Sequence, residues 1–233
     1  MIAGLYDCFK HWSERGTVWL YSDTHFGDSD LKHRPSDEEQ IKRINSKVGK
    51  YDTIIFLGDV GDLNAVRQIR GYKVLVAGNH DAGRTNYERQ IITQLFSKEL
   101  YTKKQVLDLM KTMYPNCRYS VEERLQLGSF FEASADNMLF DEIYEGPLMI
   151  GEKLILSHEP IENISWAFNI HGHVHDLSAA INRSPNHFNC CAEAINHTPV
   201  NFNQWMREGH LKHIESIHRA TIDRATRKKG RRY

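Results

Sequence analysis

The chain has 233 residues, with 30 Lys and Arg against 30 Asp and Glu, 40% hydrophobic residues and 26% charged residues. This balance is typical of a folded globular protein and excludes a disordered, collagen-like or coiled-coil chain. No uninterrupted apolar run reaches the roughly 18 residues that a membrane-spanning helix needs. Asp7 and Lys10 interrupt the stretch where a signal peptide would be apolar. We therefore expect a cytoplasmic protein without a membrane partner.

Five short apolar runs, rich in β-branched and aromatic residues, predict buried strands. They cover residues 17–23, 52–59, 72–80, 152–159 and 166–173. Between the first two, SDEEQIKRINSKVGKY begins with a Ser/Asp cap and places Ile41, Ile44 and Val48 at helical spacing. Residues 62–70 predict a second, shorter helix. Strands that alternate with helices predict an α/β fold.

Residues 84–136 do not show this alternation of strands and helices. Their apolar residues recur at three- and four-residue steps, which predicts a helical insertion. The insertion is either a cap beside the site or an outlying helical pair.

The last ten residues, 224–233, carry six basic residues and no acidic one. This basic tail is compatible with a nucleotide or nucleic-acid partner, although most short basic tails are simply solvated. We expect a single domain over residues 1–233 that includes the insertion and the tail.

The residues that could bind a metal ion or take part in catalysis stand at the ends of the five apolar runs. They are Asp23 and His25, Asp59 and Asp62, Asn79, His80 and Asp81, His158, and His173 and His175. Strand ends converge in α/β folds, so these five blocks predict one site. Carboxylates, imidazoles and an amide suit Mn²⁺ or Fe²⁺, whereas the four cysteines lie outside the blocks. About seven candidate ligands are too many for one ion and suit two ions that share a bridging ligand.

The strings DTH, GDVGD, GNHD, SHEP and GHVH, in this order, resemble the five blocks of the calcineurin-like metallophosphoesterases. The longer strings SDTHFGD, FDEIYEGPL, LSHEPI and NIHGHVH resemble the small bacterial and phage-type members. The resemblance implies a four-layer α/β/β/α sandwich with a dinuclear metal centre at one edge. It implies one ion held by Asp23, His25 and His175, another held by Asn79, His158 and His173, and Asp59 as the bridge. We expect two divalent ions, Mn²⁺ first, with Fe, Ni or Zn as alternatives.

Two ions that share a carboxylate can lower the pKa of a water between them toward about 7, which makes hydroxide available to attack phosphorus. His80 is expected either to protonate the leaving alkoxide or to bind the substrate phosphate. The resemblance implies that Asp81 orients or charges the His80 imidazole. Asp62 is expected to tie the loop after Asp59, and His171 either supports a ligand or packs. The histidines outside the blocks are expected not to be ligands: His11, His33, His187, His197, His210, His213 and His218.

The first functional hypothesis is a metal-dependent phosphodiesterase acting on nucleotides or nucleic acid. A phosphomonoesterase, including a protein phosphatase, is the second hypothesis, and a non-catalytic metal-binding scaffold is the third. The presence of every expected ligand and of His80 favours an enzyme. Two positions depart from the family pattern: Leu63 stands where many relatives carry Arg, and Asp28 stands where the small relatives carry His. Both positions are expected near the substrate, and nothing in the sequence indicates an oligomeric state.

Overall fold

The structure is a computed structural model in which residues 1–31, 33–81 and 140–216 are described. The chain divides into two compact units: Met1–Asp81 with Glu142–Tyr233, and Ala82–Asp141. The predicted helical insertion at 84–136 and the basic tail at 224–233 lie outside the described residues. None of the helices within the described ranges combines the length and the apolar character that crossing a membrane requires.

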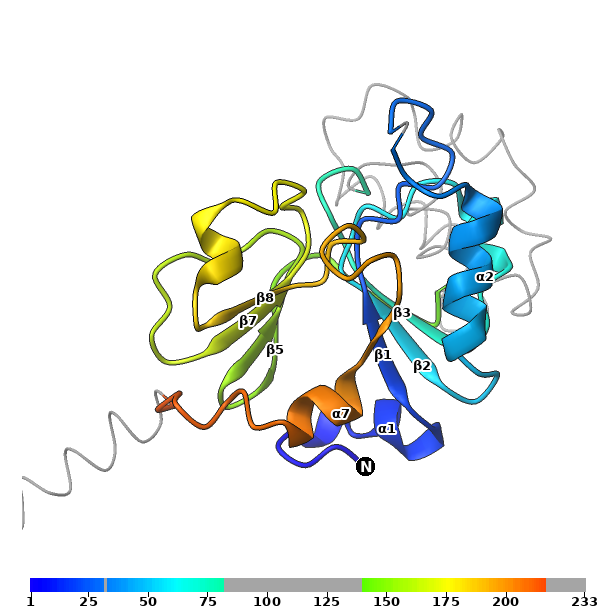
Figure 1. Ribbon diagram of the computed structural model, residues 1–233. Coiled ribbons are helices and arrows are strands. Elements are labelled where there is room, and N and C mark those ends of the chain that lie inside the picture. The colour runs from blue at the N-terminus through cyan, green and yellow to red at the C-terminus, as the bar shows by residue number, and fades with distance from the viewer. Residues whose placement is uncertain (32, 82–139, 217–233) are drawn as a thin grey trace, which may run out of the picture. The chain divides into compact units, whose positions relative to one another are not determined.

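Two β-sheets face one another in the first unit (Figure 1). The five-stranded sheet has the order β4-β3-β2-β1-β9. Its strands are β1 (Val18–Tyr21), β2 (Thr53–Phe56), β3 (Tyr72–Val76), β4 (Glu142–Tyr144) and β9 (Val200–Asn201). Strands β1 to β4 are parallel, whereas β9 is antiparallel to β1. Because parallel strands end at the same edge, the loops after β1, β2 and β3 are brought together.

The four-stranded sheet has the order β5-β6-β7-β8. It contains β5 (Leu148–Gly151), β6 (Leu154–Leu156), β7 (Phe168–His171) and β8 (His187–Asn189). Strands β6, β7 and β8 are parallel, and β5 is antiparallel to β6. A single apolar core contains side chains from both sheets, among them Leu20, Ile55, Ile150 and Ile170.

The longest helix of the described residues is α2 (Asp37–Lys47), on the outer side of the five-stranded sheet (Figure 1). The Ser36 hydroxyl accepts a hydrogen bond from the Glu39 amide at 3.3 Å, and three acidic residues occupy the first turn. Both features stabilise a helix N-terminus. Asp62 caps α3 (Leu63–Arg67) by accepting from the Asn64 amide at 2.9 Å. The structural role expected for Asp62 is therefore confirmed.

The remaining helices are short: η1 (Asp7–Phe9), α1 (His11–Arg15), η3 (Ala180–Arg183) and α7 (Phe202–Arg207). Both α1 and α7 lie near one end of the sheets (Figure 1). The α/β class and the two-sheet sandwich are confirmed. Within the described ranges, however, the layer beside β8 is the 3-10 helix η3 rather than an α-helix. The surrounding sequence, INRSPNH, explains this, because Asn, Ser and Pro are poor residues for a helix interior.

Candidate metal centre and active site

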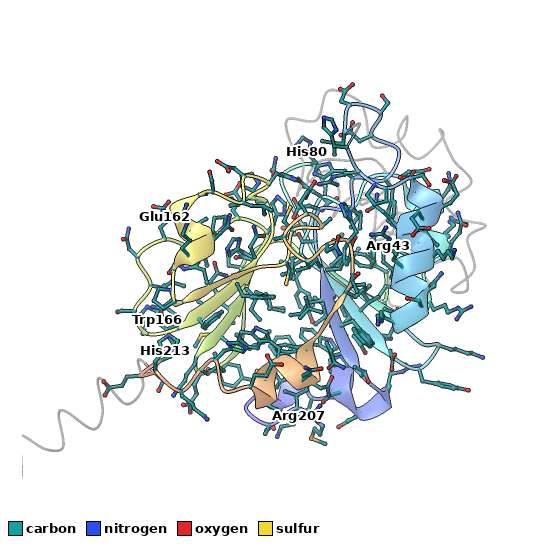
Figure 2. The ribbon with its side chains drawn as sticks, in the orientation of Figure 1. Arg43, His80, Glu162, Trp166, Arg207 and His213 are labelled. Atoms are coloured by element: carbon teal, nitrogen blue, oxygen red, sulfur yellow. The ribbon has the colours of Figure 1, made fainter. Side chains whose placement is uncertain are left out.

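The five sequence blocks lie in loops directly after the strands. Strand β1 ends at Tyr21, β2 at Phe56, β3 at Val76 and β7 at His171, so each predicted strand is longer than the observed one. His80, which follows β3, lies at the opposite end of the first unit from Arg207 of α7 (Figure 2). The candidate site is thus built on loops at the carboxyl ends of parallel strands, where ligand sites of α/β folds are found.

Asp23, His25 and His175 form the first group of possible ligands. The Asp23 Oδ1 atom lies 3.9 Å from His25 Nε2 and 3.4 Å from His175 Nε2. Asp23 is fully buried, and within the described residues neither its Oδ1 atom nor His25 Nε2 has a hydrogen-bond partner. A buried polar atom without a partner costs about 1–3 kcal/mol. A cation between these atoms would remove that cost, so the group fits a metal ion.

Asp59, His158 and His173 form the second group, together with the amide of Asn79. The Nε2 atom of His158 lies 3.3 Å from Asp59 Oδ2, 2.8 Å from Asn79 Oδ1 and 3.1 Å from His173 Nδ1. The Nδ1 atom lies 2.8 Å from the carbonyl oxygen of Leu57, which can only accept a hydrogen bond. Nδ1 therefore carries the proton in the neutral ring, and the Nε2 lone pair faces two oxygen atoms. The lone pairs of His158 Nε2, Asp59 Oδ2 and Asn79 Oδ1 therefore converge, which is a suitable environment for a cation.

Asp59 contacts both groups. Its Oδ2 atom is 3.7 Å from His25 Nε2 as well as 3.3 Å from His158 Nε2, and its Oδ1 atom accepts from the His80 amide at 2.9 Å. Burial raises the pKa of Asp59, but when the His158 ring also carries a proton on Nε2, its hydrogen bond and positive charge outweigh burial and leave this pKa below its ordinary value. Burial lowers the pKa of His158, and its bond to Asp59 reverses the shift, so that the pKa is raised. A charged carboxylate thus lies between the two groups.

The backbone of the site is strained. Asp23, His25, Asp59 and His173 have φ angles of 57°, 42°, 53° and 66°. Residues other than glycine rarely adopt positive φ, and such strain gathers at functional sites. Gly172 lets the backbone of its loop lie close to the side chains of Ser22 and Asp23, because a Cβ atom there would lie 1.9 Å from Ser22 Oγ and 2.3 Å from Asp23 Oδ2. The fold accepts unfavourable backbone conformations in order to direct these side chains to one place.

The two residues predicted to be catalytic differ in exposure. The His80 side chain is 57% exposed, and its Nε2 atom lies 4.0 Å from Asp59 Oδ2. Asp81 is buried, and its carboxylate accepts from the amides of Gly78, Asp59 and Val60 at 2.9, 2.7 and 3.2 Å. Burial raises the pKa of Asp81 despite these bonds. Two hydrogen bonds of Asp81 come from the loop that carries Asp59 and one comes from Gly78 in its own loop; none of those found among the described residues involves the His80 imidazole.

His171, for which two roles were open, is fully buried. Its Nδ1 atom lies 2.7 Å from the carbonyl oxygen of Gly172, and burial lowers the pKa of His171 to about 4. It therefore packs as a neutral ring beneath the GHVH loop. Several histidines outside the blocks have partners of their own: His187 contacts Ser184, His210 contacts Glu208 and His213 contacts Asn186.

Three residues near the site were missed from the sequence. Arg34, Cys191 and Glu193 surround the Nδ1 atom of His175, at distances of 3.0, 3.3 and 3.1 Å. None of them follows one of the five predicted strands. Asp28, by contrast, was singled out, and its Oδ2 atom lies 3.9 Å from His25 Nδ1 with the side chain 39% exposed. A partly exposed carboxylate therefore lies beside the ring nitrogen of His25 that does not face Asp23 and Asp59.

Comparison with known proteins gives one family match and two similar solved structures. The sequence profile described as calcineurin-like phosphoesterase matches residues 16–177. A solved protein of unknown function from Aquifex aeolicus has a similar fold, with a TM-score of 0.51 and 19% identity over 82% of this chain and 98% of that chain. The nuclease MPE from Pseudomonas putida has a TM-score of 0.35 and 17% identity over 68% of this chain and 61% of that chain. No curated protein matches the sequence.

Proposed function

The chain belongs to the calcineurin-like phosphoesterase family and is therefore a hydrolase of phosphate esters, and we propose that it is a phosphodiesterase with nucleotide or nucleic-acid substrates. The observation that carries this proposal is the convergence of two groups of imidazoles and carboxylates, in which the buried Asp23 Oδ1 and His25 Nε2 atoms have no hydrogen-bond partner among the described residues. Asp23, His25 and His175 would hold one divalent ion. Asn79, His158 and His173 would hold the other, with Asp59 between them. Mixed oxygen and nitrogen ligands suit Mn²⁺.

When bound, two such ions neutralise phosphate oxygens and make a water molecule acidic enough to serve as nucleophile near neutral pH. The protein's own contribution at the open side is His80. Its half-exposed imidazole can donate a proton to the leaving alkoxide oxygen, which is worth about 10²- to 10⁴-fold in rate. The backbone of His80 is held by Asp59, and Asp81 in turn holds the amide of Asp59. Asp81 is thus proposed to position the site rather than to exchange a proton.

Asp28 supports the preference for a diester. A phosphate monoester carries a charge of about −1.5 to −2 near neutral pH, whereas a diester carries a single negative charge. The Asp28 carboxylate beside His25 repels both substrates, but it repels the more highly charged monoester more strongly. Replacing Asp28 with Asn is expected to increase monoester hydrolysis more than diester hydrolysis. A ratio of the two activities that stays unchanged would remove Asp28 from the argument.

The proposed function is tested by comparing hydrolysis of bis-p-nitrophenyl phosphate and p-nitrophenyl phosphate by the full chain in Mn²⁺. We expect faster turnover of the diester and loss of about 10²-fold or more in kcat for His80→Ala. His213→Ala is a matched control, since this imidazole bonds to Asn186 at the far end of the unit (Figure 2). Faster monoester hydrolysis would favour the phosphomonoesterase. Metal binding without turnover of either substrate would favour the scaffold.

The state of the cysteines supports a cytoplasmic location. In the part of the chain that the structure describes, Cys8, Cys190 and Cys191 are free thiols, and the two adjacent cysteines are both buried. Free thiols are usual in reducing compartments, whereas secreted proteins more often carry disulfides. Localisation of a tagged full-length chain in its own cells, with fractionation as the second measurement, tests this part of the proposal.

A further inference from the structure

Three side chains that belong to none of the five sequence blocks surround one nitrogen atom of a proposed metal ligand. The Nδ1 atom of His175 lies 3.1 Å from Glu193 Oε2, 3.0 Å from Arg34 Nη2 and 3.3 Å from Cys191 Sγ. Arg34 and Glu193 also form an ion pair with each other, and the Arg34 side chain is only 6% exposed. The Glu193 side chain is 27% exposed, and a charge as well shielded from water as that of Arg34 is costly unless it is fully satisfied. Its presence here calls for a physical reason.

The position of Glu193 determines which nitrogen of His175 is free to bind a metal ion. The other ring nitrogen, Nε2, faces Asp23 Oδ1 at 3.4 Å and is the atom directed at the first ligand group. Glu193 Oε2 can only accept a hydrogen bond from Nδ1, and Arg34 Nη2, which can only donate, is already paired with Glu193 Oε1, so we assign the Nδ1 proton to the bond with Glu193. The Nε2 lone pair is then directed toward the site. Metal-binding histidines commonly donate their second nitrogen to a carboxylate in this way.

Arg34 connects Glu193 to the strained loop of the first ligand group. Its Nη1 atom donates to the carbonyl oxygens of Asp23 and Thr24 at 2.6 and 3.2 Å, and its Nε atom donates to Glu193 Oε1 at 2.5 Å. Asp23 has a φ angle of 57°, which requires support from its surroundings. One guanidinium therefore fixes the backbone of Asp23 and the carboxylate that orients His175. Two of the three ligands in the first group depend on it.

The same atoms do not form a good third metal site. His175, Cys191 and Glu193 each direct a donor atom within 4.8 Å of the others, a spacing that an ion could bridge. The Arg34 guanidinium, however, already lies 3.0 Å from His175 Nδ1 and is paired with Glu193. Its positive charge would repel a cation. The Cys191 thiol instead donates to Glu193 Oε2 at 2.9 Å, so it adds one more bond to the carboxylate.

We propose that Glu193 is a positioning residue that holds His175 with Nε2 directed at the first metal ion, and that Arg34 holds both Glu193 and the Asp23 backbone. This inference rests on the proposed function, because it requires a metal ion at Asp23, His25 and His175. Residues that support a ligand in this way typically contribute 10- to 100-fold to metal affinity or activity. The effect is expected at the first ion alone, since no contact of Glu193 with the second group is found among the described residues.

The test is Mn²⁺ titration of metal-free full-length protein by calorimetry, with Co²⁺ absorption spectra as the second readout. We expect wild type to bind two ions, and Glu193→Ala to weaken one of them about 10- to 100-fold and to alter the Co²⁺ spectrum. Glu193→Gln keeps an oxygen that accepts from Nδ1, so it should recover most of the affinity. Glu208→Gln is the matched control, because Glu208 forms the same kind of carboxylate–imidazole contact, 3.0 Å from His210, on the exposed surface.

Several results would overturn the inference. The inference is wrong if Glu193→Ala binds both ions with wild-type affinity and gives the wild-type spectrum. It is also wrong if Glu193→Ala loses affinity for both ions to the same degree. Glu193→Gln that is as impaired as Glu193→Ala would show that charge rather than orientation matters. If Glu193→Ala does not fold, the Gln variant with its Co²⁺ spectrum still decides between orientation and charge. Failure of the proposed function is separate, since it is decided by the turnover of the two substrates by wild type, whereas this inference is decided by metal affinity and the Co²⁺ spectrum.

Discussion

Carboxylates that are largely shielded from water lie at both ends of the five-stranded sheet, and their surroundings differ completely. At the amino end, Glu142 accepts hydrogen bonds from Trp12 Nε1 at 3.0 Å, Tyr72 OH at 2.8 Å and Tyr144 OH at 2.5 Å, and it contacts His11 Nε2 at 2.5 Å. At the carboxyl end, Asp23 is fully buried, yet its Oδ1 atom has no hydrogen-bond partner among the described residues. Burial alone therefore does not distinguish a structural carboxylate from a functional one.

The difference lies in the partners that the sequence supplies. Glu142 is surrounded by indole, phenol and imidazole donors, and Asp52, also at the amino end, accepts from Thr17 N, Gly49 N and Trp19 Nε1. Asp23 and Asp59 are instead surrounded by imidazoles from four different loops, on a backbone with positive φ angles. One end is optimised for stability, whereas the other keeps lone pairs unsatisfied. Such incomplete satisfaction is expected where a ligand completes the site.

The sharpest way to break this comparison is Asp23→Asn. We expect activity to fall by about 10²- to 10³-fold, the scale on which removal of one electrostatic contact to the reacting groups acts. The stability of the metal-free protein should remain within about 1 kcal/mol of wild type, because Asn tolerates the φ of 57° and keeps an oxygen that can accept from the His173 amide, as Asp23 Oδ2 does at 2.9 Å. Kinetics and urea unfolding of the same preparation measure both quantities. A large loss of stability would mean that Asp23 is structural, like Glu142.

The second prediction concerns the metal itself. A ligand that binds only the folded state adds about 2.7 kcal/mol of stability at 100 times its Kd. Mn²⁺ should therefore raise the unfolding midpoint of wild-type protein after treatment with a chelator. It should raise the midpoint of Asp23→Asn much less. Thermal unfolding with and without Mn²⁺ measures the effect, and equal stabilisation of both proteins would place the ion elsewhere.

Much of this contrast could be predicted from the sequence. The five apolar runs correctly located β1, β2, β3, β6 and β7, because a buried strand needs a continuous apolar stretch. Their ends were predicted too far along the chain. Residues such as Asp23 and Asp59 adopt positive φ and therefore cannot continue a strand. The blocks that follow those strands do converge, since parallel strands share an edge.

Other features have no local signal in the sequence. Strand β9 has two residues, and α7 has six. Both are too short for a periodic pattern, and α7 is held mainly by its buried Phe202 and Trp205 side chains. Glu193 was missed for a similar reason, because its importance comes from contacts with Arg34, which is distant in sequence. Tertiary contacts of this kind cannot be obtained from spacing along the chain.

The third prediction concerns the amino end. Glu142→Gln keeps one acceptor oxygen but replaces the other with a donor that faces a phenol, so it should cost about 1–3 kcal/mol of stability. Activity per folded molecule should not change, since Glu142 lies at the end away from the site. Urea unfolding and kinetics check both statements. Glu152→Gln, at an exposed position, is the control and should alter neither quantity. A selective loss of activity would remove the distinction between the two ends.

The last and smallest predicted effect is the pH dependence of the stability difference between wild type and Glu142→Gln. Burial raises the pKa of Glu142, but hydrogen bonds from Tyr144, His11, Tyr72 and Trp12 outweigh burial and leave this pKa below its ordinary value of 4.5. The carboxylate therefore contributes stability above that value and loses the contribution as pH falls through its lower folded-state pKa. The stability difference between wild type and Glu142→Gln should be full near pH 7 and smaller near about pH 3.5. A stability difference that grows toward acid pH would mean that Glu142 is protonated in the folded protein. The contrast between a charged, fully bonded Glu142 at the amino end and the site at the carboxyl end would then be wrong.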